Sequence, residues 1–230
     1  MAMQWIPLES NPEVLNKYAH NLGLPSNWNF IDVFSLDSDV LAMVPQPVAG
    51  LVFIYPITPE SEAEPFGEQL EKSDDVYFMK QTVSNACGTV AMLHTIGNNL
   101  EKLKLKEGSS LLNFFNKSSD ASCTPETRAK LMAEDETLTS AHEEAAGEGQ
   151  TETPSRDTCT NLHFVALLHR SGRLWEMDGR RNGPICHGAT SEDQFLLDSA
   201  KVMQKYIDRQ GKDDVHFSVI ALSEGESMFS

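Results

Sequence analysis

The chain has 230 residues, and its 18 Lys and Arg against 34 Asp and Glu give a formal net charge of −16. Such a surface repels nucleic acid and anionic membranes, so neither partner is expected, and it attracts basic proteins or peptides. The length suits one domain over 1–230, and because neither a signal peptide nor a membrane-spanning apolar run is visible, we expect a soluble, cytoplasmic protein.

The first half of the chain mixes helical and extended patterns. In chain order they predict a helix at 11–24, a strand at 28–34, a short helix at 39–43, a strand at 50–56, a surface loop at 58–75, and helices at 85–99, 109–117 and 125–135. Pro12 and Pro125 suit first helical turns, and Ser38 and Thr124 suit N-caps. The strand at 50–56 is apolar on both faces, so it is expected in the middle of a sheet.

The second half begins with a polar, acidic stretch at 139–160, which has almost no large apolar residue and is expected to be mobile. A β-hairpin follows, with strands at 162–169 and 173–179 joined at RSG. An amphipathic helix at 191–210, with Ser191 as its cap, and a strand at 215–222 complete the pattern. The mixture predicts an α/β (α+β) fold without internal repeats.

The four cysteines, Cys87, Cys123, Cys159 and Cys186, are widely spaced and form no CxxC pair. Paired cysteines are typical of zinc sites, and disulfides are rare in cytosolic proteins, so reduced thiols and no metal or cofactor are expected. Only Cys87 has a distinctive setting. With Asn85 as the cap of the helix at 85–99, Cys87 lies in the first turn, where free N–H groups and the helix dipole stabilise a thiolate. A buried packing cysteine is the alternative interpretation.

A nucleophilic cysteine needs a base, and the chain offers seven histidines. His94 lies about 10 Å along the same helix at 1.5 Å per residue, so it cannot reach the thiol and is expected to be a packed residue. His142 falls in the polar stretch and is expected to be poorly positioned. The others away from the hairpin suit the role less well: His20, His187 and His216.

The hairpin supplies both a base and a carboxylate to orient it. If Ser171-Gly172 is a two-residue turn, His163 and Asp178 share one face of the hairpin, whereas an odd-numbered loop would separate them. Glu176 is a rival orienting group on that face, and His169 lies near the turn, away from Asp178. An ordinary hairpin histidine beside a surface acid is the alternative. For the oxyanion, the side-chain N–H of Gln81 and the backbone N–H of Cys87 are candidates, although spacing alone supports Gln81 weakly.

Four segments carry a resemblance to a known family: WIPLESNP at 5–12, VYFMKQT followed by NACGT at 76–89, LHFVAL at 162–167 and LWEMDGR at 174–180. In this order, over nearly the whole chain from about Trp5 to Leu222, they resemble the ubiquitin C-terminal hydrolases, which are cysteine deubiquitinases. The resemblance implies a papain-like fold, a central, mostly antiparallel sheet flanked by helices, and a knotted backbone, which is a rare exception among proteins.

The resemblance also implies roles for residues. Cys87 matches the nucleophile, His163 the histidine, Asp178 the aspartate and Gln81 the oxyanion residue. The stretch 139–160 matches a crossover loop over the active site, which admits only small or unfolded adducts. The ubiquitin contacts implied are Ile6, Pro7, Leu8, Glu9 and Asp32.

The expected function is therefore cleavage of such adducts from the C-terminal glycine of ubiquitin through a thioester. The basic ubiquitin tail also fits the acidic chain. Two alternatives stay open: a stoichiometric ubiquitin-binding protein with little turnover, and a hydrolase for a related ubiquitin-like modifier. The chain ends soon after 215–222, so the long C-terminal extension of larger family members is not expected, and a small soluble monomer is.

Overall fold

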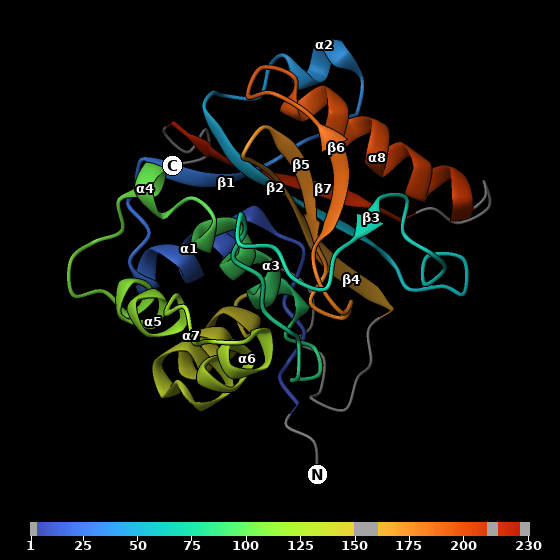
Figure 1. Ribbon diagram of the computed structural model, residues 1–230. Helices are drawn as coiled ribbons and strands as arrows, with labels where there is room; N and C mark the ends of the chain where they lie inside the picture. The colour runs from blue at the N-terminus through green and yellow to red at the C-terminus, as the bar shows by residue number, and fades with distance from the viewer. Residues whose placement is uncertain (1–3, 150–160, 211–215, 226–230) are drawn as a thin grey trace.

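The computed structural model describes residues 4–149, 161–210 and 216–225. Its seven-stranded sheet has the order β1-β7-β2-β4-β5-β6-β3, and each neighbouring pair is antiparallel (Figure 1). The strands are β1 (Trp28–Asp32), β2 (Val48–Pro56), β3 (Glu68–Gln69), β4 (Leu162–Arg170), β5 (Arg173–Met177), β6 (Ile185–Ala189) and β7 (Ser218–Glu224). The helices are α1 (Pro12–Leu22), α2 (Ser38–Leu41), α3 (Cys87–Gly97), α4 (Leu100–Leu103), α5 (Ser110–Ser118), α6 (Pro125–Glu134), α7 (Glu136–Ala146) and α8 (Phe195–Gln210). The predicted fold class is confirmed.

Helices cover both faces of the sheet. In Figure 1, α2 and α8 lie on one side, and α1, α3, α5, α6 and α7 lie on the other. Strand β2 is buried along its whole length, with Val52 and Ile54 in the core under α3 and with Leu51 and Phe53 in the core under α8. Its apolar character on both faces therefore reflects a strand between two helical layers, as predicted.

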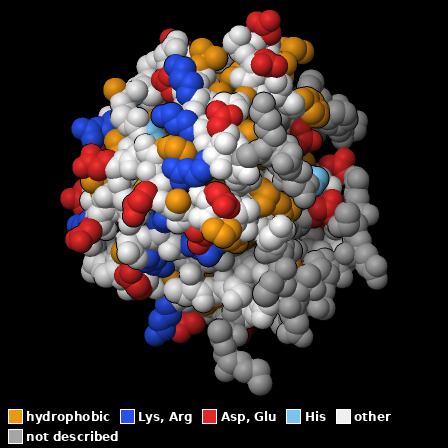
Figure 2. Space-filling model, turned by 90° about the vertical axis from the view of Figure 1, so that its right-hand side faces the viewer, with side chains coloured by type: hydrophobic (Ala, Val, Ile, Leu, Met, Phe, Trp, Pro, Cys, Tyr) orange, Lys and Arg blue, Asp and Glu red, His pale blue; other side chains and the backbone are white. Residues whose placement is uncertain are grey.

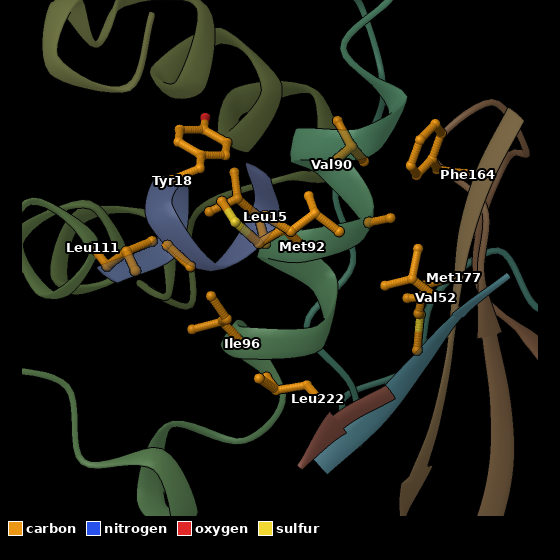
Figure 3. Close-up of a cluster of buried hydrophobic side chains, with 14 of the residues drawn as sticks. Leu15, Tyr18, Val52, Val90, Met92, Ile96, Leu111, Phe164, Met177 and Leu222 are labelled. Carbon is orange, nitrogen blue, oxygen red and sulfur yellow. The ribbon is translucent and has the colours of Figure 1, made fainter. Parts of the chain in front are cut away.

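Helix α3 lies in the middle of the larger core. All its residues from Cys87 to Ile96 are buried, and most of them are apolar, so the helix has no solvent-exposed polar face. Figure 3 shows Leu15 of α1 on one side of this helix and Phe164 and Met177 of the sheet on the other. The helix that carries the candidate nucleophile is thus fixed by packing on all sides. Among the helices that the structure describes, none is both long and apolar enough to cross a membrane.

Local capping explains several helix starts. The Asn11 side chain accepts a hydrogen bond from the backbone N–H of Glu13 and starts α1, and Gly23, at φ +117°, ends it. Thr124 caps α6 as predicted, with Pro125 at the first position. These short polar signals are readable from sequence because the bonds connect residues only two or three positions apart.

Several predicted boundaries and caps are wrong. Ser38 does not cap α2, because Asp37 is the N-cap and Ser38 is the first residue of the helix. Residues 139–146 belong to helix α7, not to a loop, because the Asp135 side chain caps that helix and Leu138 is buried against the core. Asn85 does not cap α3. It adopts a left-handed conformation with φ +63°, and its side chain donates to the carbonyl of Trp5 instead. Helix α8 begins at Phe195, after a turn, rather than at 191, and β7 begins at 218 rather than at 215.

Four elements went unpredicted: α4, α7, β3 and β6. Strand β6 has the sequence ICHGA, in which Ile185 is the single residue of the β-branched and aromatic types that mark strands. It forms because β5 presents an edge, with Trp175 opposite Cys186. Strand β3 then pairs with β6 over two residues inside the predicted loop at 58–75.

His142 forms a buried hydrogen-bond chain that ties three segments together. Its Nδ1 lies 2.8 Å from the Thr89 hydroxyl of α3, and its Nε2 lies 2.7 Å from the Ile6 carbonyl. Tyr18 of α1 extends the chain to Thr89 at 3.1 Å. The expectation that His142 is poorly positioned is wrong, because α7 places its ring fully inside the core. Burial lowers its pKa to about 4, so the ring is neutral at pH 7.

We predict that the free energy of unfolding decreases as the pH is lowered from about 6.5 to about 4. An unfolded histidine with a pKa of about 6.5 takes up a proton in this window, whereas folded His142 does not, so the unfolded state is favoured by up to about 3 kcal/mol. His94, whose pKa burial also lowers to about 4, adds to the effect.

Urea denaturation at a series of pH values tests this prediction. The variant His142→Gln is expected to lose about 1–3 kcal/mol at pH 7, because Thr89 and Ile6 lose a buried partner, and to depend less on pH. If the free energy of unfolding of this variant depends on pH as steeply as that of wild type, His142 does not carry the effect.

Candidate active site

The β4–β5 hairpin brings the predicted base and acid together. Arg170 pairs with Arg173 across the turn Ser171-Gly172, both of whose residues have positive φ. This is the predicted two-residue turn, and it fixes the register along the whole hairpin. Carried to the far end of the strands, this register places Asp178 on the face of His163, and the His163 Nε2–Asp178 Oδ1 distance is 2.7 Å.

Both members of this pair are shielded from water, each with about 2% of its side chain exposed. Asp178 also accepts a 2.9 Å hydrogen bond from the backbone N–H of Arg180. Burial raises the pKa of Asp178, but the hydrogen bond and charge of His163 lower it more, and the pKa lies below its ordinary value. Asp178 is therefore an ionised carboxylate that is hydrogen-bonded to Nε2 of the imidazole ring and so orients it.

Cys87 is the first residue of α3 and is buried. Burial lowers the pKa of His163, but hydrogen bonds to Asp178 and Cys87 together raise it to about 9. His163 thus contacts both residues, although α3 and the catalytic face of the hairpin belong to different layers of the fold. A ring protonated at neutral pH therefore lies beside the sulfur at the N-terminus of α3.

Among the described residues, no side chain caps the start of α3. The N-cap residue, Ala86, has no side chain that could cap the helix. The backbone N–H groups of the first turn therefore do not donate to a side chain of the N-cap residue. An added Cβ on Gly88 would lie 3.1 Å from Leu8, so a glycine allows the segment at 5–9 to pack against this turn. The helix therefore presents its dipole and backbone donors beside the sulfur of Cys87.

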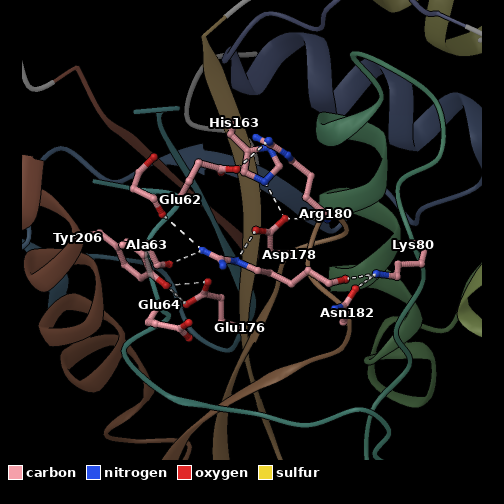
Figure 4. Close-up of polar contacts among 12 residues, drawn as sticks. Glu62, Ala63, Glu64, Lys80, His163, Glu176, Asp178, Arg180, Asn182 and Tyr206 are labelled. Carbon is pink, nitrogen blue, oxygen red and sulfur yellow. Dashed lines mark hydrogen bonds and ion pairs between the residues drawn. The ribbon is translucent and has the colours of Figure 1, made fainter. Parts of the chain in front are cut away.

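Gln81 is held next to the loop that follows β5. Its backbone N–H donates to the Gly179 carbonyl at 2.8 Å, and its side-chain Nε2 donates to the Val83 carbonyl at 3.2 Å. The neighbouring Lys80 reaches the Arg181 carbonyl at 2.6 Å and the Asn182 side chain at 3.0 Å (Figure 4). These contacts fix the Gln81 segment against the loop that carries Asp178.

The rival acid and histidines have other partners. Glu176 lies 2.8 Å from His187 and 3.0 Å from the Tyr206 hydroxyl, so it orients these groups rather than His163 (Figure 4). His94 is packed, as predicted, with its Nε2 3.0 Å from the backbone nitrogen of Met79. The Glu176–His187 pair was missed because it depends on β6, which the sequence did not reveal.

With this geometry in view, comparison with known proteins is decisive. The profile of the family described as ubiquitin carboxyl-terminal hydrolase, family 1, matches residues 5–208. The chain belongs to this family of cysteine hydrolases. Related family members include a ubiquitin carboxyl-terminal hydrolase of Aplysia californica, 46% identical over 207 residues, which are 90% of this chain and 96% of that protein.

Two other relatives have similar coverage. Ubiquitin carboxyl-terminal hydrolase 3 of Arabidopsis thaliana is 45% identical, over 96% of this chain and 94% of that protein, and human isozyme L1 is 40% identical, over 96% and 98%. The solved catalytic domain of Trichinella spiralis UCH37, bound to ubiquitin vinyl methyl ester, has a TM-score of 0.78 at 20% identity, over 96% of this chain and 95% of that domain. This structural likeness supports the fold.

The expected substrate contacts of this family member differ in exposure. Pro7 and Leu8 are buried, whereas Ile6 and Glu9 are partly exposed and Asp32 is exposed. A larger apolar side chain, Phe34, follows Asp32 and is 79% exposed. Sequence reasoning did not single out Phe34, because an isolated aromatic residue gives no sign of its exposure. Of the expected crossover loop, 147–149 are described outside α7, and 150–160 lie outside the described residues.

We predict that Gly179→Ala lowers kcat by roughly 10- to 100-fold. The new Cβ would lie 2.8 Å from Val90 and 3.0 Å from the Cβ of Gln81, so the Gln81 segment must move away from the loop. Gly108→Ala is the control, because its Cβ meets nothing within 4 Å although φ is +69°. It is expected to cost stability but not kcat, and equal kcat values in the two variants would contradict the prediction.

We also predict that kcat/KM decreases as the pH rises through about 9, because the raised pKa of His163 keeps its ring protonated below that value. A pH–rate profile, with circular dichroism to show that the fold persists, measures this alkaline limb. A limb near 6.5, the ordinary value for histidine, would contradict the described geometry.

Proposed function

We propose that this family member cleaves small or unfolded adducts from the C-terminal glycine of ubiquitin. The observation that carries the proposal is the 2.7 Å His163–Asp178 hydrogen bond, with Cys87 close enough to raise the pKa of His163, in a chain that belongs to this family. This set contains a nucleophile, a base and an orienting carboxylate, which are the groups that acyl transfer requires.

In the proposed reaction, the Cys87 sulfur attacks the carbonyl carbon of the terminal glycine. The Nε2 of His163 is bonded to Asp178, so the other ring nitrogen, Nδ1, is left to exchange a proton with Cys87 and with the leaving amine. Departure of the amine leaves a thioester on Cys87. Water, deprotonated by His163, then attacks the thioester and releases ubiquitin with a free carboxylate.

The developing oxyanion needs donors that are already in place. We assign this role to the backbone N–H of Cys87 and the side-chain amide of Gln81. One N–H of the Gln81 amide is directed to Val83, which orients the group and leaves its second N–H for another acceptor. The contacts of Lys80 and Gly179 keep the segment in position.

Substrate recognition is proposed to combine charge with apolar contacts. A net charge of −16 favours the basic tail of ubiquitin. On the face in Figure 2, acidic side chains are interspersed with basic ones, so the charge acts there as a diffuse field. Ile6, Glu9, Asp32 and the exposed Phe34 are the candidate contacts. Buried Pro7 and Leu8 support them from below.

The segment from 147 to 160 is proposed to cross over the site and to limit the size of the adduct. A single domain over 1–230 that works as a monomer in the cytoplasm, without nucleic acid or membrane partners, completes the proposal. The starting point of the crossing is the C-terminal end of α7 rather than residue 139.

Hydrolysis of ubiquitin with a fluorescent C-terminal amide tests the proposed function. Wild type is expected to release the fluorophore, and Cys87→Ala is expected to lose release by at least roughly 10⁴-fold while it retains ubiquitin binding. Tight binding without release by wild type would favour a shielding protein. Neither binding nor release would exclude ubiquitin as the substrate, and tails of ubiquitin-like modifiers would be tested next.

A further inference from the structure

The carboxylate of Asp178 has a second cationic neighbour besides His163. While Oδ1 faces His163, the other oxygen, Oδ2, lies 3.6 Å from Nε of Arg181. The Arg181 side chain is only 19% exposed, so solvent screens this pair weakly. The positive charge of Arg181 is one of the causes that lower the pKa of Asp178.

Arg181 is fixed by contacts on its other sides. Its NH2 group donates to the Ala63 carbonyl at 2.9 Å and is 3.5 Å from the Ser61 carbonyl, both in the loop at 57–66. Its backbone carbonyl accepts from Lys80, the neighbour of Gln81. Since both backbone and guanidinium are anchored, the charge is held at one place beside Oδ2.

We propose that Arg181 is a positioning residue for the hydrolytic reaction, which keeps Asp178 ionised and oriented while His163 changes its protonation state. The inference rests on the proposed triad. Arg181 adds a permanent positive charge to a site in which the charge of His163 alternates. It also links this site to the loop at 57–66.

The need for such a charge follows from the proposed catalytic cycle. When His163 is protonated, its charge balances Asp178. When His163 has passed its proton to the leaving amine, a buried carboxylate would face a neutral ring, and burial would favour its protonation. A protonated Asp178 no longer orients the ring for the second half of the reaction. Arg181 prevents this loss because a guanidinium does not release its proton in proteins.

Other ionisable groups surround the pair, and the test must separate Arg181 from them. They are Cys87 and His94 on α3, Tyr55 on β2, His163 on β4, Glu176 on β5, Tyr206 on α8, and the Arg180–Glu62 pair at 2.9 Å. Arg181 differs from these groups because its side chain contacts both Asp178 and the loop at 57–66.

The chain provides a matched control. Arg209 of α8 also donates to a carbonyl of the same loop, at Glu64 with 2.8 Å, and its guanidinium stacks over the Phe66 ring at 3.5 Å. The variant Arg181→Gln removes the charge but keeps amide donors, and Arg181→Lys keeps the charge. Arg209→Gln makes the same chemical change at the same loop without a contact to Asp178.

The experiment measures two pH profiles for each variant: kcat/KM on ubiquitin with a fluorescent C-terminal amide, and the rate at which iodoacetamide alkylates Cys87, mapped by mass spectrometry. Loss of a positive charge makes both the imidazolium and the thiol less acidic. In Arg181→Gln, the pH-dependent limb of each of these two profiles is therefore expected to move to higher pH by about half a unit or more. The value of kcat/KM is expected to decrease about tenfold. Arg181→Lys and Arg209→Gln are expected to keep wild-type limbs.

A purely structural role would give a different result. If Arg181→Gln and Arg209→Gln lower kcat/KM alike and leave the limbs in place, the proposal is wrong. Should Arg181→Gln fail to fold, Arg181→Met and Arg181→Lys carry the same comparison of an uncharged with a charged side chain.

If the alkylation rate of Cys87 depends on pH in the same way as that of the more accessible Cys123, the triad is not assembled. This result would also overturn the proposal. If wild type releases no fluorophore but the alkylation limbs still shift in Arg181→Gln, the proposed substrate fails while the role of Arg181 stands.

Discussion

The register of the β4–β5 hairpin is the constraint on which the rest of the site depends. A two-residue turn with positive φ at Ser171 and Gly172 pairs Arg170 with Arg173, and the same register runs to the far end of both strands. A slip by one residue would turn Asp178 to the opposite face from His163. The hydrogen bond between the two residues is therefore set at the other end of the hairpin.

The nucleophile reaches this pair because helix α3 is buried in the core and cannot shift independently. Its first residue, Cys87, lies where the helix dipole ends, beside a His163 ring whose pKa is about 9. Two other histidines are buried with pKa values of about 4: His94, which belongs to α3, and His142, which packs against it. Burial lowers the pKa in all three cases. Only at His163 do an anionic partner and a sulfur reverse the direction.

Much of this arrangement was predictable from the sequence where the signals are local. The two-residue turn, the alternation along the hairpin and the capping residue Thr124 each act over a few positions. The position of Cys87 at the start of a buried helix followed from an apolar run, although the cap at Asn85 was assigned wrongly. A left-handed Asn85 looks the same in sequence as a capping one, and tertiary contact with Trp5 decides between them.

Features that depend on distant partners were not predictable. His142 was placed in a mobile loop because its neighbours are polar, yet Thr89 and the Ile6 carbonyl hold its ring in the core. Strand β6 exists only because β5 offers an edge, and the Glu176–His187 pair depends on it. Arg181 is only three residues from Asp178, but its contact with Ala63 joins positions 118 residues apart, of which no local pattern gives a sign.

The central claim is that Cys87 is the nucleophile of an assembled Cys87–His163–Asp178 site that receives the ubiquitin tail. Reaction with ubiquitin that carries a C-terminal vinyl methyl ester, followed by intact mass and peptide mapping, tests this most directly. The account predicts one added ubiquitin, bound to the peptide that contains Cys87, and none in Cys87→Ala. An adduct at Cys123 or Cys186, or unchanged labelling of Cys87→Ala, would contradict it.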